Sequence, residues 1–245
     1  MKQLRDFTMA RVALGRAGNS VPVREMLAFQ LAHARARDAV YCPFDAARLA
    51  AQTNGICVHS AAHDRAQYLR RPDLGRQLDA ESRVRIAALK SACDAVFVIC
   101  DGLSALAVDQ SAAELITAVK PRLDAWTIAP VVVCEQGRVG VGDEIGEAMG
   151  AALAVVLIGE RPGLSAADSM GIYLTWAPRP GRTDAERNCI SNIHPEGLST
   201  GAAAELLLFL MNESRARQLS GVPLKAPLIQ SSTGVKLESS ASRTI

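Results

Sequence analysis

The sequence predicts an α/β fold: a Rossmann-like three-layer sandwich with an N-terminal helical subdomain. From about residue 79 onward, short continuous apolar runs alternate with segments of helical periodicity, at the spacing of βαβ units. The first third has helical patterning and only one short strand-like run. We therefore divide the chain into a helical subdomain at 1–78, a Rossmann-like domain at 79–222 and a flexible tail at 223–245.

The front third is expected to contain two helices. Apolar residues at helical spacing predict the first at Val21–Val40, with Ser20 as a candidate N-cap. The second helix is predicted at Phe44–Gln52. The segment Ile56–His59 is a short strand at best, and 68–76 is expected to be an irregular, strongly basic turn.

The rear part is expected to alternate strands and helices. Helices are predicted at 81–92, 104–119, 143–149 and 199–218, and strands at 95–100, 128–134, 152–158 and 172–176. The uninterrupted apolar run at 95–100 suits a strand buried on both faces, as in a parallel sheet. In such sheets ligands bind beyond the carboxyl ends of the strands. We therefore expect a binding surface in the loops at 137–147, 159–165 and 187–194.

Composition excludes several classes of protein. The hydrophobic fraction of 49% and the charged fraction of 21% are ordinary for a globular chain. No uncharged apolar run reaches about 18 residues, and the start lacks the apolar core of a signal peptide, so we expect no membrane segment. Six cysteines occur without a CxxC pair, which favours free thiols in a reducing cytosol.

Charge is unevenly distributed along the chain. The net charge of +2 is too small to indicate nucleic-acid binding. Residues 1–76 carry 12 Lys and Arg against 6 Asp and Glu, a net charge of +6, and the remainder carries 15 against 19, a net charge of −4. The basic front part is either a docking surface for an acidic partner or anionic ligand, or a solvated arginine-rich face.

Two loops contain candidate binding residues. The segment GRVGVGD at 137–143 is glycine-rich but lacks both the GxGxxG order and the Lys-Ser/Thr of a phosphate loop. Its glycines let the backbone approach a ligand and leave Val139 as a main-chain or apolar contact. Glu160 directly follows a predicted strand. It is either paired with Arg161 or solvated, or it is a hydrogen-bond acceptor at the end of the strand, and no second carboxylate is placed for acid–base chemistry.

Nucleophilic and metal chemistry are weakly indicated. Cys189 precedes His194 by five residues, which permits a thiol nucleophile but does not establish a dyad, so a packing thiol or ligand contact is the favoured interpretation. His59 and His63 are four residues apart without an obvious third ligand, so no metal site is predicted. No GxSxG motif, kinase motif set or aromatic–basic interleaving occurs. The loops therefore indicate a binding surface, and no catalytic residue is predicted.

Seven segments taken together resemble the small (light) subunit of ethanolamine ammonia-lyase. They are ARVALGRAG (10–18), LAFQLAHARARDAV (27–40), YLRRPDLGRQL (68–78), CDGLSALAV (100–108), GRVGVGDEIGE (137–147), LIGERPGLS (157–165) and RNCISNIHPEGL (187–198). They cover about residues 10 to 220, and the last three are highly specific in combination.

The resemblance implies an adenosylcobalamin-dependent lyase that splits ethanolamine into acetaldehyde and ammonia by radical chemistry. In this family the Co–C bond breaks homolytically, and the adenosyl radical abstracts a substrate hydrogen. The large subunit, a TIM-type barrel, holds the substrate and the catalytic groups. The small subunit closes over the cobalamin, in an assembly of six large and six small chains. Carried over position by position, the family's cobalamin contacts fall on Val139, Glu160 and Cys189.

The resemblance also bears on the metal, the partner and the location. The sequence lacks the DxHxxG motif of proteins that donate a histidine to cobalt, and the family binds cobalamin with its own dimethylbenzimidazole on the metal. The implied location is the cytoplasm. Some members have a long N-terminal extension associated with a bacterial microcompartment. Because this sequence begins only nine residues before the segment ARVALGRAG, we do not expect packaging. We expect part of the partner interface at Arg35, Arg37, Arg70 and Arg71.

Two other functions are alternatives to a lyase subunit. A nucleotide-binding oxidoreductase would need a GxGxxG after the first strand and an acidic residue about 20 positions further on, which the sequence does not supply. A carrier that binds cobalamin without a partner remains an alternative.

Overall fold

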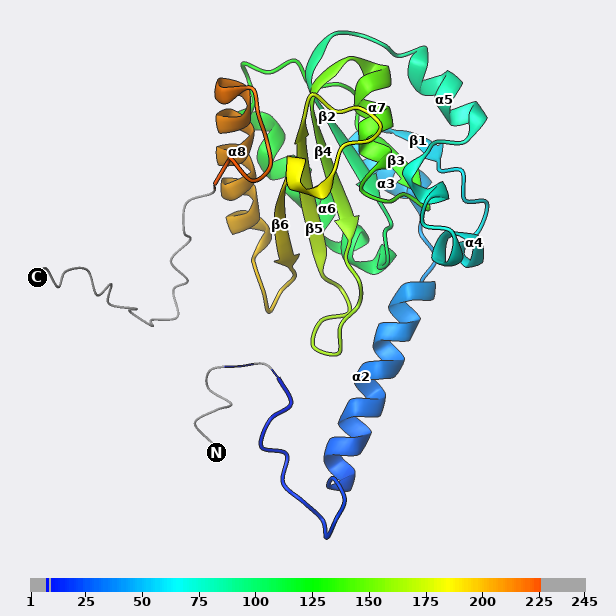
Figure 1. Cartoon of the computed structure of the whole chain (residues 1–245), viewed down its shortest axis with the longest axis vertical. Helices are drawn as coiled ribbons and strands as arrows, with labels where there is room; N and C mark the ends of the chain where they lie inside the picture. The colour runs from blue at the N-terminus through cyan, green and yellow to red at the C-terminus, as the bar shows by residue number, and fades with distance from the viewer. Residues whose placement is uncertain (1–7, 9, 226–245) are drawn as a thin grey trace, which may run out of the picture.

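The structure is a computed structural model that describes residue 8 and residues 10–225. Six strands form one sheet in the order β1-β3-β2-β4-β5-β6. The strands are β1 (Ile56–His59), β2 (Cys93–Cys100), β3 (Val132–Glu135), β4 (Ala151–Gly159), β5 (Met170–Trp176) and β6 (Arg187–Ile193). Strands β1 to β4 are parallel to one another, whereas β5 runs antiparallel to both β4 and β6. The sheet therefore has a parallel part and an antiparallel extension (Figure 1).

Helices cover both faces of the sheet. They are α2 (Val23–Tyr41), α3 (Ala46–Thr53), α4 (Arg65–Arg70), α5 (Ala80–Ala87), α6 (Ala105–Val119), α7 (Val141–Met149) and α8 (Thr200–Arg217), with short 3₁₀ turns at Leu74–Arg76, Lys120–Arg122 and Asp184–Glu186. Helices α3, α6 and α8 pack on one face, and α5 and α7 pack on the other. The predicted α/β class is confirmed.

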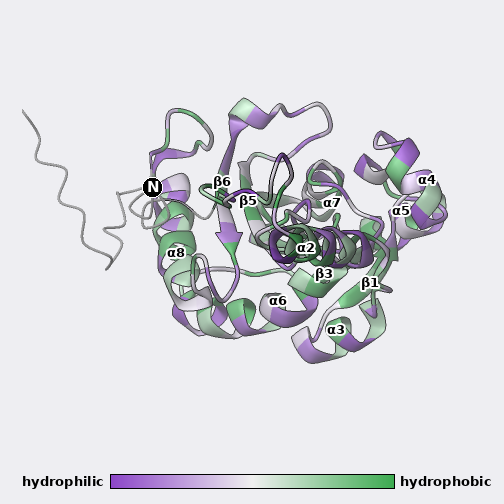
Figure 2. Ribbon diagram, turned by 90° about the horizontal axis from the view of Figure 1, so that it is seen from below, coloured by the Kyte–Doolittle hydropathy of each residue, from purple (hydrophilic) through white to green (hydrophobic). Residues whose placement is uncertain are grey.

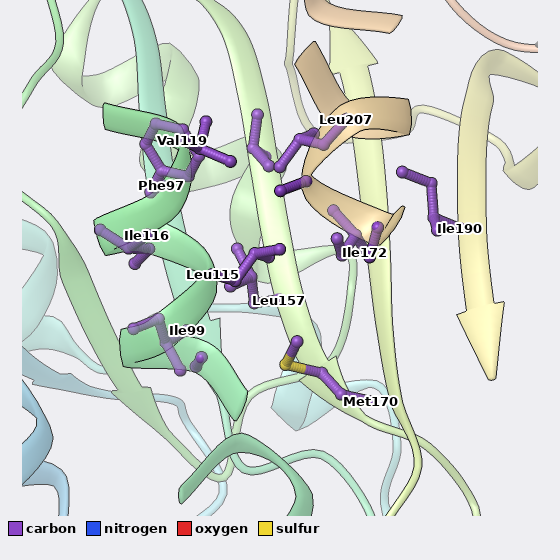
Figure 3. Packing of buried hydrophobic residues seen from close by; sticks show 14 of the residues in the cluster. Phe97, Ile99, Leu115, Ile116, Val119, Leu157, Met170, Ile172, Ile190 and Leu207 are labelled. Carbon is purple, nitrogen blue, oxygen red and sulfur yellow. The ribbon is translucent and has the colours of Figure 1, made fainter. Parts of the chain in front are cut away.

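The central strands are buried on both sides. In β2, Phe97 and Ile99 face α6, while Val96 and Val98 face α7, and all four are fully buried. Successive side chains of a strand point to opposite faces, so an uninterrupted apolar run is what a doubly covered parallel strand requires. Figure 3 shows the apolar layer that contains Phe97 and Ile99, which packs against α6 and against Leu207 of α8.

The last strand corrects the prediction. We expected a loop at 187–194, but Arg187–Ile193 forms β6 and pairs with β5. Its burial explains the error: Arg187, Ile190 and Ile193 are buried, whereas Cys189 and the polar residues near it are exposed. An edge strand with one open face has the composition of a loop, because its outward side chains are polar. The N-cap prediction was also wrong, since α2 is capped by Pro22 and no side chain bonds its first turn.

The front third is partly built into the sheet and its helical layer, and partly projects away from them. Strand β1 pairs with β3, and α3 packs against α6. Helix α2 instead projects from the edge where the carboxyl ends of the parallel strands lie (Figure 1), and Figure 2 shows it end-on. The division at residue 78 remains a prediction, and the predicted tail lies outside the described residues from 226 onward.

Within the described range, no helix combines the length and the apolar character that crossing a bilayer requires.

Candidate functional site

At the end of β4, the backbone at Gly159 passes very close to the backbone of residues 101–104. A Cβ on Gly159 would lie 2.0 Å from the carbonyl oxygen of Ser104, and one on Gly102 would lie 2.2 Å from the carbonyl oxygen of Gly159. Only glycine fits at these positions, because a side chain would displace backbone. The loop closes where the N–H of Glu160 donates to the carbonyl of Ser169 at 2.9 Å. The matching segments 100–108 and 157–165 therefore meet by direct backbone contact.

Glu160 is held as a hydrogen-bond acceptor. Its Oε2 accepts from the hydroxyl of Ser169 at 2.5 Å and from the backbone N–H of Asn192 at 3.2 Å. Asn192 has a left-handed backbone, with φ of +64°, and its Oδ1 lies 2.9 Å from Nε2 of His194. The sequence left open a pairing of Glu160 with Arg161, but Arg161 is exposed and the carboxylate bonds to Ser169 and Asn192. Glu160 thus has a fixed orientation at the carboxyl end of the central strand β4.

Cys189 lies on β6 opposite Tyr173 of β5. The residue is exposed on the whole, and its side chain lies beside that of Tyr173 on the neighbouring strand. Partial desolvation by neighbouring atoms raises the pKa of the Cys189 thiol and also that of the Tyr173 hydroxyl. A thiol with a raised pKa is a poor nucleophile at neutral pH, and the ring of His194 is engaged with Asn192. The geometry therefore favours a packing or ligand-contact role for Cys189.

Val139 lies in the turn between β3 and α7. It is half-buried and packs against the core on the α7 side of the sheet, where Tyr173 also packs. Its backbone N–H has no acceptor in the part of the chain that the structure describes. Helix α7 begins at Val141, two residues before the helix predicted at 143–149, so only residues 137–140 of the expected binding loop lie outside it.

A second group of side chains fixes this turn. The Tyr68 hydroxyl donates to the carbonyl of Gly137 at 3.2 Å, and the guanidinium of Arg138 stacks 4.2 Å from the Tyr68 ring centre. Asp101 accepts from the N–H of Gly137 at 3.2 Å and from Arg65 at 3.1 Å. Burial raises the pKa of Asp101 to about 6, and the nearby Arg65 opposes that rise.

These side chains occupy the crevice between the carboxyl ends of β2 and β3. The connections from these two strands go to helices on opposite faces, and such a crevice is where doubly wound folds bind nucleotides. Tyr68 is fully buried there and the side chain of Arg65 is 17% exposed. The protein's own residues fill the position of a nucleotide, which argues against a dinucleotide-binding oxidoreductase. Sequence reasoning missed this group, and the only signal was a tyrosine within a basic segment.

A buried ion pair connects α7 to β6. Arg187 donates to the two oxygens of Asp143 at 2.7 and 2.6 Å, and both side chains are about 5% exposed. Arg187 also donates to the hydroxyl of Thr175 at 2.7 Å and to the carbonyl of Arg182 at 2.9 Å. The pair fixes the helix that follows Val139 against the strand that carries Cys189.

The three predicted site residues lie on one face of the sheet. Glu160 follows Val156 of β4 by four residues, Val156 pairs with Tyr173, and Tyr173 pairs with Cys189, so all share the α7 face. Helix α7 covers β4, but Cys189 on β6 remains exposed. We call the surface formed by Val139, Glu160, Tyr173 and Cys189 the open face. Glu160, Tyr173 and Cys189 thus lie on neighbouring strands, and Val139 packs on the same side of the sheet at the end of β3.

A cavity of about 720 Å³ lies beside the loop at 160–169. It is open to solvent on one side and lined by α2, including Leu31 and Arg35, by residues 163–168 and by residues 194–196. No motif in the sequence predicted it. Among the described residues, no group of three or more His, Cys, Asp or Glu side chains is placed to hold a metal ion.

Comparison with known proteins decides the family. The sequence matches the family described as "Ethanolamine ammonia-lyase light chain (EutC)" over residues 1–225. The chain belongs to the ethanolamine ammonia-lyase light chain family. The resemblance inferred from the seven segments is therefore confirmed, and the chain is a subunit of a lyase.

Relatives of this light chain are similar over most of their length. The "Ethanolamine ammonia-lyase small subunit" of Ralstonia nicotianae is 57% identical over 233 residues, covering 91% of this chain and 86% of that protein. Proteins of the same description from Pseudomonas fluorescens and Azotobacter vinelandii are each 54% identical, covering 91% of this chain and 85% and 87% of theirs. The term small subunit implies a large partner subunit.

Proposed function

We propose that this light chain is the small subunit of an adenosylcobalamin-dependent ethanolamine ammonia-lyase, and that its open face contacts the cobalamin through Val139, Glu160 and Cys189. One observation supports the proposal: residues from three separate motifs lie on the α7 side of the sheet, which is left exposed at Cys189 of β6. When bound, the cofactor supplies the radical chemistry that converts ethanolamine to acetaldehyde and ammonia.

The open face suits a corrin, which is broad and carries several amide groups. Glu160 offers a fixed acceptor, the free N–H of Val139 offers a donor, and the pair formed by Tyr173 and Cys189 offers a flat, partly apolar contact. These residues bind and orient the ring and shield one side of it from water. They include no acid–base pair, which fits a subunit that leaves catalysis to its partner.

We further propose that α2 forms part of the interface with the large subunit, in an assembly of six large and six small chains. Apolar side chains on this helix are strongly exposed: Val23 at 64%, Met26 at 46%, Leu27 at 56% and Leu31 at 54%. An apolar surface of this kind on a projecting helix is typical of a protein–protein contact. The neighbouring Arg35 is exposed, which favours an acidic region on the partner.

The four interface arginines can be ranked. All four are exposed, but Arg71 is closely paired with Asp73 at 2.6 Å, whereas Arg37 lies 3.7 Å from Asp38. Reversing charge at Arg35 and Arg37 should therefore weaken co-purification with the large subunit more than the same change at Arg71. Equal assembly of all variants would contradict this interface.

We also propose that the fold is Rossmann-like with an antiparallel extension, and that the protein acts in the cytoplasm. The parallel order β1-β3-β2-β4 with helices on both faces supports the first point. Six cysteines that are all free thiols support a reducing compartment.

Reconstitution tests the proposed function. Purified chain, large subunit, adenosylcobalamin and ethanolamine are mixed and acetaldehyde is measured. We expect turnover only when both chains are present. Turnover by this chain alone would refute the subunit role, and tight cobalamin binding by this chain alone would favour a cofactor carrier instead.

A further inference from the structure

Ser169 places a buried hydroxyl against Glu160 at the edge of the open face. The residue is 7% exposed, and its hydroxyl donates to Oε2 of Glu160. The backbone N–H of Asn192 donates to the same oxygen at 3.2 Å. A backbone N–H can only donate, so Oε2 is fixed as an acceptor. One carboxylate oxygen is thus committed to this chain, and the orientation of the whole group is set.

The other oxygen of Glu160, Oε1, is left for a ligand. It lies above Gly171, where a Cβ would be 2.9 Å away. No hydrogen bond from the described residues reaches Oε1, and it is not one of the fully buried atoms without a partner, so it is accessible to solvent. The next residue of β5 on this face is Tyr173, which lies opposite Cys189 of β6. Oε1 therefore borders the open face.

We propose that Ser169 is a positioning residue for Glu160, and that Oε1 of Glu160 accepts a hydrogen bond from the N–H₂ of a corrin amide. The inference rests on the proposed function above. An accessible carboxylate oxygen attracts an amide N–H and repels an amide carbonyl, so the open face selects the donor end of the ligand's amide. Ser169 acts through Glu160 and does not touch the cofactor.

The first test replaces the acceptor by a group of the same shape. Cyanocobalamin is titrated against the complex of this chain with the large subunit, and the dissociation constant is measured by absorbance. In E160Q the carbonyl oxygen keeps the bonds to Ser169 and Asn192, which turns the amide N–H₂ outward toward another donor. We expect E160Q to bind roughly 10-fold or more weakly, at least as weakly as E160A. Wild-type affinity in E160Q would overturn the assignment of an amide donor.

The second test is a double-mutant cycle in the same complex. S169A should weaken binding roughly 5- to 20-fold when Glu160 is present and less than about 2-fold in the E160A background, because Ser169 acts through the carboxylate. S169C keeps a weaker donor in a similar volume, and its affinity should fall between those of the wild type and S169A.

Ser104 provides the matched control. It is also buried, and its hydroxyl donates to the carbonyl of Ala167 in the same loop at 2.9 Å. S104A should have the same effect in both backgrounds. An equal loss for S169A in both backgrounds would show a structural role and overturn the inference while the contact at Glu160 stands. Unchanged affinity in E160A would instead overturn that contact, and with it the part of the proposed function that rests on Glu160.

Discussion

The buried pair of Arg187 and Asp143 should be one of the most sensitive points of the fold. D143N removes the charge of the carboxylate with little change in volume and leaves the guanidinium of Arg187 without a buried anionic partner, since Asp184, 3.7 Å away, is fully exposed. Both side chains are about 5% exposed and share two hydrogen bonds of 2.7 and 2.6 Å. Breaking one partner of such a pair costs about 3–5 kcal/mol of unfolding free energy.

Urea unfolding of the purified chain measures this cost. At a slope of about 2–3 kcal/mol per M, the midpoint should fall by about 1–2.5 M. The pair of Arg122 and Glu205 is the control, because its side chains are 50% and 67% exposed, and E205Q should cost less than about 1 kcal/mol. The double variant D143L/R187M removes both charges and should cost less than D143N alone. A D143N cost no larger than that of E205Q would refute the reasoning.

Three other predictions follow from the loops, the buried carboxylate and the projecting helix. G159A should cost more than about 2 kcal/mol of unfolding free energy, because its Cβ would lie 2.0 Å from a backbone oxygen. In G201A the added Cβ meets no atom within 4 Å, so the unfolding free energy should stay within about 1 kcal/mol of wild type. Equal costs for G159A and G201A would contradict the close backbone contact at Gly159. The pKa of Asp101 rises from 3.8 to about 6 on folding, so its contribution to stability is complete below pH 3.8 and is lost as the pH rises through 6. The unfolding free energy of wild type should therefore fall relative to D101N by about 2 kcal/mol between pH 4 and 6, and parallel pH profiles would contradict this. Replacing Leu27 by Asp should weaken co-purification with the large subunit, whereas Asp at Val84 of α5, which is even more exposed, should not.

Much of the fold was predictable because local patterns agree with it. The apolar run that contains Val96 and Val98 suits a doubly buried strand, and α6 and α8 lie close to their predicted ranges. Strand β6 was not predictable, because its exposed Cys189 and Asn192 resemble a loop until their pairing partner β5 is known.

The proposed cobalamin contacts were predictable from the sequence, whereas the distant residues that hold their loops in place were not. Val139, Glu160 and Cys189 were identified from three motifs and a family resemblance, and the structure places them on one face. Their supports come from distant positions: Arg187 is 44 residues from Asp143, and Tyr68 is 69 residues from Gly137. Such pairs are set by tertiary packing, and a single sequence carries no local signal for them.

Blocking the open face tests the central claim most directly. C189W places a large side chain in the middle of that surface, and V84W places the same side chain on an exposed position of α5. Each variant is assembled with the large subunit, and cyanocobalamin binding to the complex is measured. Our account predicts that C189W assembles but loses most of its cobalamin affinity, while V84W binds like wild type. Wild-type cobalamin binding by the C189W complex would contradict the assignment of the open face.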